Sequence, residues 1–151
     1  MEQSDFELVF QKAAAREAEA YRFYRDVAER TANESVKEIF LELAQQEKGH
    51  EELMWKFKGD ATLELKFQAV PDYKVAETLD DPEPTAEMKP ADAIALAVKR
   101  EQKSVELYRG LADTCTDAEL KKVFENLANM ESGHKHKLEK LFVDIGYPEV
   151  W

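Results

Sequence analysis

The chain has 151 residues, which is enough for one domain with a substantial core. Charged residues make up 35% of the sequence and the formal net charge is −11, so nucleic acid and anionic membrane surfaces, which bind basic patches, are not expected as partners. The N-terminal sequence resembles no signal peptide, no apolar run approaches a membrane span, and a single cysteine allows neither an internal disulfide nor a Cys-x-x-Cys metal site. We therefore expect one cytoplasmic domain over residues 1–151.

Apolar residues recur at helical spacing from residue 5 to residue 58, which predicts two long helices joined by a short turn. The first helix is expected over about 5–30 and the second over about 34–58. Side chains that could form capping boxes lie at both starts, Ser4 with Glu7 and Ser35 with Glu38.

Residues 60–89 contain several prolines and no helical period, so they are expected to connect two helices. The segment TLELKFQAV alternates apolar and polar residues, which predicts an extended course along the bundle. Thirty residues reach much farther than the ~38 Å of a 25-residue helix, which suits one long crossover in a four-helix bundle. We assign this crossover no function.

Helical spacing returns after the crossover and predicts two further helices. The third is expected to begin near Pro90, a good first-turn residue, and to end near Asp113. The fourth is expected to begin after Thr116 and to end at Gly146. Cys115 lies in the turn between them, and we assign it no role.

The two predicted helical hairpins are related by an internal repeat with a shift of 84 positions. The shift aligns AAAREAEAYRFYRDVA (13–28) with AVKREQKSVELYRGLA (97–112), and VKEIFLELAQQEKGHEELMWKF (36–57) with LKKVFENLANMESGHKHKLEKL (120–141). Any two amphipathic hairpins share leucines and alanines, but identical Glu, Tyr, Gly and His residues in one register indicate a duplication. The identities are Arg16, Glu17, Tyr24, Arg25, Phe40, Leu43, Ala44, Glu47, Gly49 and His50 with their counterparts.

Each helix carries a core-facing stripe of residues spaced by three or four, and ionisable residues interrupt each stripe near its middle. A single Glu or His in such a stripe is more often a surface residue or a hydrogen-bonded core histidine. Four carboxylates meeting in a dry core would instead cost several kcal/mol each, so protons or cations must relieve the repulsion. Two divalent cations would balance four carboxylates, and two imidazoles would complete the set. The candidate metal ligands are Glu17, Glu47, His50, Glu101, Glu131 and His134.

The ligand types point to iron or manganese, because an oxygen and nitrogen set without thiolate disfavours structural zinc. In each Glu-x-x-His pair the two side chains share a helix face, so the His can bind one ion while the Glu bridges two. Tyr24 and Tyr108 lie one heptad beyond Glu17 and Glu101. They are expected either to hydrogen-bond the ligand carboxylates or to be ordinary core tyrosines.

Gly49 and Gly133 precede the two histidines, although glycine inside a helix costs about 1 kcal/mol relative to alanine. Two explanations are open: each glycine allows a close helix approach, or each marks a bulge. Residues off the stripes are expected to lie outside the site: Glu19, Glu51, Glu52 and His136.

These motifs resemble the ferritin-like superfamily, and within it the rubrerythrin-type proteins. The marks are Glu17 with Tyr24, EKGH at 47–50, Glu101 with Tyr108, and ESGH at 131–134. The resemblance covers both hairpins and implies an all-α, ferritin-like four-helix bundle. It also implies a carboxylate-bridged di-iron centre that reacts with peroxide or dioxygen, and a homodimer or larger homo-oligomer.

Two features differ from the rubrerythrin pattern. The chain lacks the four cysteines of a rubredoxin module, so electrons would come from an external donor such as a rubredoxin-like protein. Ser104 stands where rubrerythrins tend to carry an extra glutamate, which puts the full peroxidase cycle in doubt and leaves a more symmetric site, as in bacterioferritins.

The leading functional hypothesis is a di-iron oxidoreductase, either a peroxide reductase or a ferroxidase-like oxidase. Glu47 and Glu131 would bridge two iron ions, with Glu17, Glu101 and the histidines as terminal ligands. The alternatives are iron storage or handling, a manganese catalase-like or membrane-associated hydroxylase activity, and a structural bundle without metal. The mean hydropathy of −0.59 does not favour the membrane-associated form.

Overall fold

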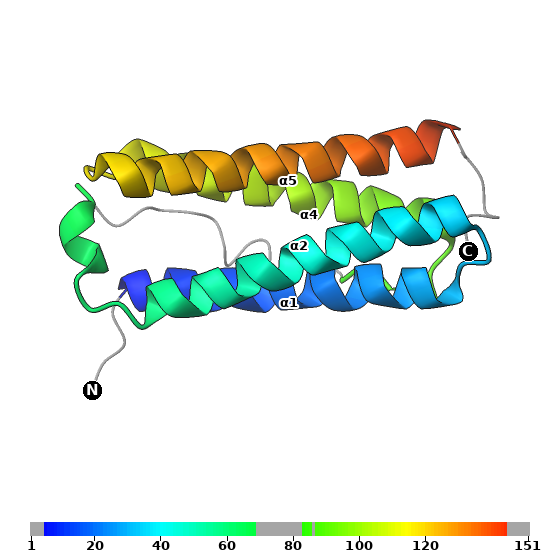
Figure 1. Ribbon diagram of the computed structural model, residues 1–151, viewed down its shortest axis with the longest axis horizontal. Coiled ribbons are helices and arrows are strands. Elements are labelled where there is room, and N and C mark those ends of the chain that lie inside the picture. The colour runs from blue at the N-terminus through cyan, green and yellow to red at the C-terminus, as the bar shows by residue number, and fades with distance from the viewer. Residues whose placement is uncertain (1–4, 69–82, 86, 145–151) are drawn as a thin grey trace.

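The computed structural model describes residues 5–68, 83–85 and 87–144. Four long helices lie side by side in a bundle (Figure 1). They are α1 (Asp5–Arg30), α2 (Glu34–Lys58), α4 (Pro90–Thr114) and α5 (Ala118–Asp144), and a short 3-10 helix, η1 (Leu63–Lys66), follows α2. Within the described ranges there is no β-strand, and the predicted all-α four-helix bundle is confirmed.

α2 begins at a side chain other than its expected capping box. Asn33, not Ser35, is the N-cap of α2, because its Oδ1 accepts hydrogen bonds from the backbone N–H groups of Ser35 and Val36 at 3.0 and 3.1 Å. The Ser35 box is therefore wrong, because the helix starts at Glu34, one residue before the serine. Ser4 and the expected end at Gly146 lie outside the described residues.

The fourth helix is capped by Asp117, whose carboxylate accepts a hydrogen bond from the backbone N–H of Leu120 at 3.0 Å. The third begins at Pro90 as predicted, since a proline at the first helical position loses no hydrogen bond there.

The start of the crossover is not extended as expected. Residues 63–66 form η1, and only Phe67 adopts an extended conformation, in an isolated antiparallel bridge with Cys115. Two backbone hydrogen bonds hold this bridge, from Gln68 N–H to the Thr114 carbonyl at 2.9 Å and from Thr116 N–H to the Lys66 carbonyl at 2.7 Å. The crossover therefore begins by covering the bundle end where α4 turns into α5 (Figure 1).

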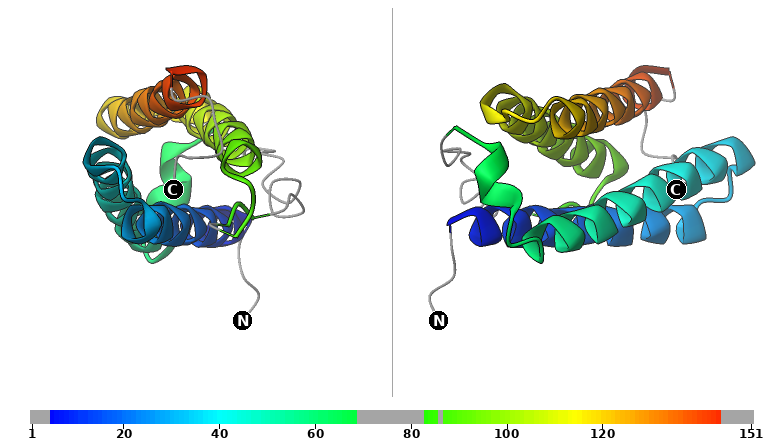
Figure 2. Two further views of the ribbon diagram at one scale, coloured as in Figure 1. Left: turned by 90° about the vertical axis from the view of Figure 1, so that its right-hand side faces the viewer. Right: turned by 60° about the vertical axis from the view of Figure 1, so that its left-hand side comes forward.

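The bundle consists of two hairpins, α1–α2 and α4–α5, arranged around a common axis (Figure 2). α2 ends at one end of the bundle and α4 starts at the other (Figure 1). Residues 69–82 and 86 of the connection between them lie outside the described residues. No helix in the described ranges is apolar enough over a sufficient length to cross a bilayer.

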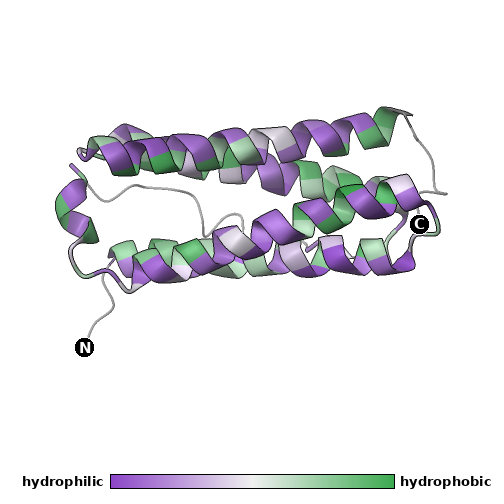
Figure 3. Ribbon diagram, in the orientation of Figure 1, coloured by the Kyte–Doolittle hydropathy of each residue, from purple (hydrophilic) through white to green (hydrophobic). Residues whose placement is uncertain are grey.

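The apolar core consists of two clusters at opposite ends of the bundle, separated by a layer of ionisable side chains. A first apolar cluster, near η1, includes Phe6, Phe10, Met54, Leu111 and Phe124. A second apolar cluster, at the opposite end, includes Phe23, Phe40, Leu43, Ile94 and Leu138. Hydrophobic and hydrophilic segments alternate along all four helices (Figure 3). Tyr21, Phe57 and Val98, three residues on the predicted core-facing stripes, are only partly buried.

Candidate metal centre

Between the two apolar clusters lies an ionisable layer, in which all four helices place charged or titratable side chains inward. Each contributing residue is at most 5% exposed. Single glutamates come from α1 and α4, and a Glu-x-x-His pair comes from each of α2 and α5. The ionisable layer consists of Glu17, Glu47, His50, Glu101, Glu131 and His134.

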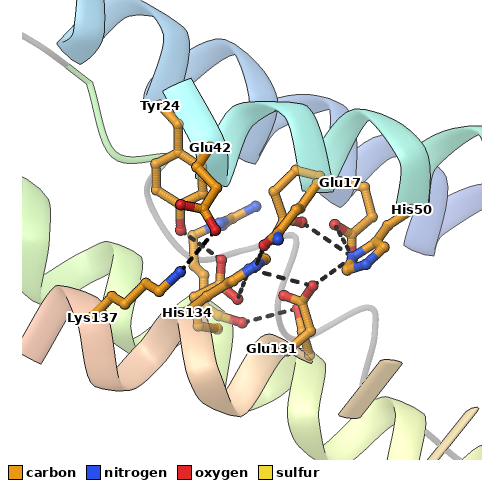
Figure 4. A network of polar contacts seen from close by, with 12 residues as sticks. Glu17, Tyr24, Glu42, His50, Glu131, His134 and Lys137 are labelled. Carbon is orange, nitrogen blue, oxygen red and sulfur yellow. Dashed lines mark hydrogen bonds and ion pairs between the residues drawn. The ribbon is translucent and has the colours of Figure 1, made fainter. Parts of the chain in front are cut away.

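The six side chains meet at ligand distances and in a two-fold pattern (Figure 4). His50 Nδ1 lies 2.7 Å from Glu131 Oε1, and His134 Nδ1 lies 2.6 Å from Glu47 Oε1, so each histidine contacts the glutamate of the opposite hairpin. The rings stack with their centroids 6.1 Å apart and their planes inclined by 17°. The internal repeat of the sequence is thus a two-fold relation in space.

Two sets of four ligand atoms can be drawn from this layer, each with all atoms within 4.8 Å of one another. One set contains Glu17 and His50, the other contains Glu101 and His134, and both contain Glu47 and Glu131. Two ions held in these sets would share the two carboxylates as bridges. The buried cluster can therefore hold metal, with each histidine serving one position.

The donor atoms themselves fit a cation. Several carboxylate oxygens are shielded from solvent and accept no hydrogen bond from a described residue outside the layer: Glu17 Oε2, Glu101 Oε2, and both oxygens of Glu47 and Glu131. Buried carboxylate oxygens without donors are costly in a protein interior, and a bound cation removes that cost. The oxygen and nitrogen composition suits Fe or Mn.

Without metal, the carboxylates of this layer cannot all be ionised. Burial, with the charge of Glu101 nearby, raises the pKa of Glu47 to about 7. Burial and the charges of Glu101 and Glu47 raise the pKa of Glu131 well above its ordinary value. Burial acts the same way on Glu101, but hydrogen bonds with Glu131 and His134 outweigh it and lower its pKa. Protons therefore take the place of cations in the metal-free protein.

The two histidines differ in protonation. Burial and the nearby His134 lower the pKa of His50 to about 4. Burial also opposes the charged form of His134, but hydrogen bonds with Glu101 and Glu47 outweigh it and raise the pKa to about 9. The two halves of the layer are thus similar in geometry and unequal electrostatically.

Both tyrosines singled out from the sequence hydrogen-bond ligand carboxylates across the hairpins. The Tyr24 hydroxyl donates to Glu101 Oε1 at 2.5 Å, and the Tyr108 hydroxyl donates to Glu17 Oε1 at 2.6 Å. Burial and the adjacent carboxylates hold the pKa values of both phenols well above 10, so both keep their protons. The tyrosines were expected either to hydrogen-bond the ligand carboxylates or to be ordinary core residues, and these contacts support the hydrogen bonds.

Two arginines that precede ligand glutamates occupy the same position of the two repeats, but the sequence did not predict a role for them. Arg16 and Arg100 are 2% and 7% exposed, and Arg100 makes an ion pair with Glu19. A recess of about 10 Å³ lies between α1 and α4, and its lining includes both arginines, Ser104 and Pro84 of the crossover. This volume holds about one water molecule.

Gln46 also contacts the ionisable layer, although the sequence did not predict this. Its side-chain oxygen lies in hydrogen-bond contact with Nε2 of His134. Position 46 is on α2 and lies outside the stripe, and its counterpart in the repeat is not glutamine, so no sequence signal marked it.

Neither proposed reason for the two helical glycines holds. A Cβ atom at Gly49 or Gly133 would meet no atom within 4 Å, so close helix approach does not require them. Both helices also continue through these positions as regular α-helix, without a bulge. Nothing in the described residues explains the glycines.

The off-stripe residues lie outside the ionisable layer, as expected. The His136 side chain is 81% exposed, and Glu52 is exposed. Glu51 is bound on the surface by the Trp55 indole N–H at 3.1 Å. Glu19 pairs with Arg100 rather than with the ligand set.

Comparison with known proteins supports this architecture. The family model described as Rubrerythrin matches residues 9–142. No curated protein matches the chain.

Two solved structures share the fold. One is from Thermotoga maritima, provisionally described as a ferritin-like diiron-carboxylate protein, with 24% identity, a TM-score of 0.71, and coverage of 96% of this chain and 99% of that one. The other is a hypothetical protein from Pyrococcus furiosus, with 27% identity, a TM-score of 0.69, and coverage of 93% and 91%.

Proposed function

Because the chain belongs to the rubrerythrin family, we propose that it is a di-iron carboxylate redox protein that reacts with peroxide or dioxygen. The observation that carries this proposal is the pair of four-ligand sets that share Glu47 and Glu131. Two ferrous ions held there would provide the two electrons that the reduction of peroxide to water requires. Manganese fits the same ligand types.

The protein residues would divide the work of holding the two ions. Glu47 and Glu131, which belong to both ligand sets, would bridge the ions. Glu17 and Glu101 would act as terminal ligands, and each histidine would bind one ion. The two tyrosine hydroxyls keep the terminal carboxylates in fixed orientations by donating hydrogen bonds to them.

Access to the ligands also favours a small oxidant. The recess between α1 and α4 reaches Glu17 and Glu101, and its volume of about 10 Å³ admits nothing much larger than a water molecule.

The side chain at position 104 supports a symmetric site. Ser104 is buried, and its hydroxyl donates to the backbone carbonyl of Arg100 at 3.2 Å, one turn back on α4. No extra carboxylate is therefore supplied from this position, so both halves offer the same types of ligand.

The test is anaerobic reconstitution of the metal-free full chain with Fe(II), followed by metal analysis and rapid mixing with peroxide or with dioxygen. We expect two iron ions per chain and oxidation of both, monitored by ferric absorbance. Glu47→Gln should lose iron, whereas Glu52→Gln, an exposed residue on the same helix, should not. Folded protein that binds no iron would refute the proposal.

Turnover would need a reductant, and the single cysteine of these 151 residues cannot form a four-cysteine iron site. We propose that a rubredoxin-like protein donates the electrons and that the chain acts as a homodimer or larger homo-oligomer. Size-exclusion chromatography distinguishes this from iron storage, since a dimer agrees with an enzyme and a shell of many subunits agrees with a store.

A further inference from the structure

The histidine and tyrosine contacts of the two halves of the metal centre match, with one exception among the described residues. The distance of 2.7 Å between His50 Nδ1 and Glu131 has its counterpart in the 2.6 Å between His134 Nδ1 and Glu47. The tyrosine hydrogen bonds to the terminal carboxylates match in the same way, at 2.5 and 2.6 Å. The exception is behind the imidazole of His134, where Nε2 contacts the side-chain oxygen of Gln46.

The repeat places Met130 of α5 where Gln46 stands on α2. Met130 is 38% exposed, and its thioether sulfur is only a weak hydrogen-bond acceptor. Nε2 of His50 is shielded from solvent and has no hydrogen-bond partner among the described residues. Nε2 of His134 therefore has a hydrogen-bond acceptor, whereas Nε2 of His50 has none among the described residues.

This difference has a direct consequence for metal binding. A histidine ligand usually donates its second ring N–H to an acceptor, which fixes the tautomer and orientation of the ring and makes the ligating nitrogen more basic. Donation from Nε2 of His134 to Gln46 leaves Nδ1 as the ligating nitrogen. Nδ1 faces Glu47 at 2.6 Å and Glu101 and Glu131 at 3.7 Å each.

We propose that Gln46 is a positioning residue that makes the two metal positions unequal, so that the position served by His134 binds the first ion and the position served by His50 binds the second. This inference rests on the proposed metal-binding function. Removing such an acceptor typically lowers metal affinity by about 10–100-fold, and we expect the two binding steps to differ by a factor of that size.

The test is a titration of the metal-free full chain with Co(II), followed by visible absorption and by calorimetry. Wild type should bind two ions in two steps. Gln46→Met, which places the repeat counterpart at position 46, should weaken the tighter step by about 10–100-fold. Gln46→Glu retains an oxygen acceptor at position 46, so its tighter binding step should stay close to that of wild type. Gln45→Met, the same change at the exposed neighbouring position, should alter neither step.

The reciprocal change keeps the inference testable if Gln46→Met does not fold. Met130→Gln adds an acceptor behind His50 and should strengthen the weaker step until the two steps approach each other. Two equal steps in wild type, or a Gln46→Met titration like that of Gln45→Met, would overturn the inference and leave the metal site intact. Folded wild type that binds no Co(II) would instead refute the proposed function itself.

Discussion

In the two apolar clusters of the bundle, side chains such as Phe40 and Phe124 leave water and need no specific partner, whereas the layer between them buries six ionisable groups. Both regions lie on the same helical stripes and are equally shielded from solvent. Burial stabilises the apolar clusters directly. In the ionisable layer burial is unfavourable until protons or cations neutralise the carboxylates. The stability of the protein should therefore depend on metal and on pH through the ionisable layer and not through the apolar clusters.

The largest effect is expected in the first apolar cluster. Phe124→Ala should lower the free energy of unfolding by about 3–5 kcal/mol, because it leaves a cavity among Phe10, Phe57 and Phe67. The loss should be the same with and without metal, measured by urea denaturation. Phe142→Ala, at a position 43% exposed, serves as the control and should change stability by less than about 0.5 kcal/mol. Equal losses from both variants would contradict the layered core.

Metal should stabilise the protein through the ionisable layer alone. At a free metal concentration 1,000 times the dissociation constant, the gain is about 4 kcal/mol. Glu47→Gln should abolish most of this gain, because Glu47 belongs to both ligand sets, whereas Phe124→Ala should retain it. Thermal unfolding with Fe(II) and with chelator measures the difference. A full metal-induced shift in Glu47→Gln would show that this carboxylate binds no ion.

Replacing the ionisable layer by apolar residues should stabilise the metal-free protein. The variant with leucine at Glu47, His50, Glu131 and His134 removes both members of each close Glu–His contact. Glu17 and Glu101 keep their hydrogen bonds from the tyrosine hydroxyls. Such exchanges are often neutral or stabilising by about 1–4 kcal/mol. Thermal unfolding in chelator at pH 7 should show a higher Tm than wild type, with no metal binding. A lower Tm would mean that water hydrates these groups.

Glu47→Leu alone should have the opposite effect to the four-leucine variant, because it leaves His134 without its close carboxylate. Breaking one partner of a buried pair is destabilising by about 3–5 kcal/mol. The two variants should therefore move the Tm in opposite directions.

Lowering the pH should stabilise the metal-free protein between pH 9 and pH 6.5. The pKa values of His134 and Glu47, about 9 and about 7, are raised relative to the unfolded chain, so the folded state gains stability as the pH falls through them. We expect a gain of roughly 1–3 kcal/mol. Below pH 6.5 the lowered pKa of His50, about 4, acts in the opposite direction. Denaturation of the chelated protein across this range measures the trend.

The metal-loaded protein should show the opposite trend over the same range, because protons compete with metal for carboxylates and imidazoles. Its affinity for metal should rise with pH. A metal-free protein whose stability did not change between pH 9 and pH 6.5 would contradict the raised pKa values.

The smallest expected effects test the equivalence of the two halves. Tyr24→Phe and Tyr108→Phe each remove one hydrogen bond to a ligand carboxylate, at 2.5 and 2.6 Å. Each should cost about 1 kcal/mol, and the two costs should agree because the contacts are related by the repeat. Chemical denaturation of the chelated variants measures both. Tyr21→Phe, at a partly buried position outside these contacts, is the control.

The helices were predictable because their signals are local. A stripe of residues spaced by three or four located α1 and α2 within one residue of their observed ends, since side chains three and four apart share a helix face. The helix starts were less predictable: Asn33 and Asp117 cap α2 and α5, and several neighbouring polar residues could have done so.

The crossover shows a different limit. Alternation of apolar and polar residues over 62–70 suggested an extended segment, but residues 63–66 form η1 with Leu63 buried. Phe67 packs on Phe6 with ring centroids 5.0 Å apart. Packing against the bundle end overrides a short local pattern, because alternation over so few residues determines little by itself.

The sequence by itself determined the four helices, their stripes, and the presence of two carboxylates and two Glu-x-x-His pairs on them, because helical periodicity and the repeat are properties of residues close in the chain. Tertiary structure alone decided that Gln46 contacts His134, a residue 88 positions away, and that Arg16 and Arg100 are buried beside the ligands. The reason is physical. Which side chains meet across two hairpins depends on how the hairpins pack, and no local spacing specifies that.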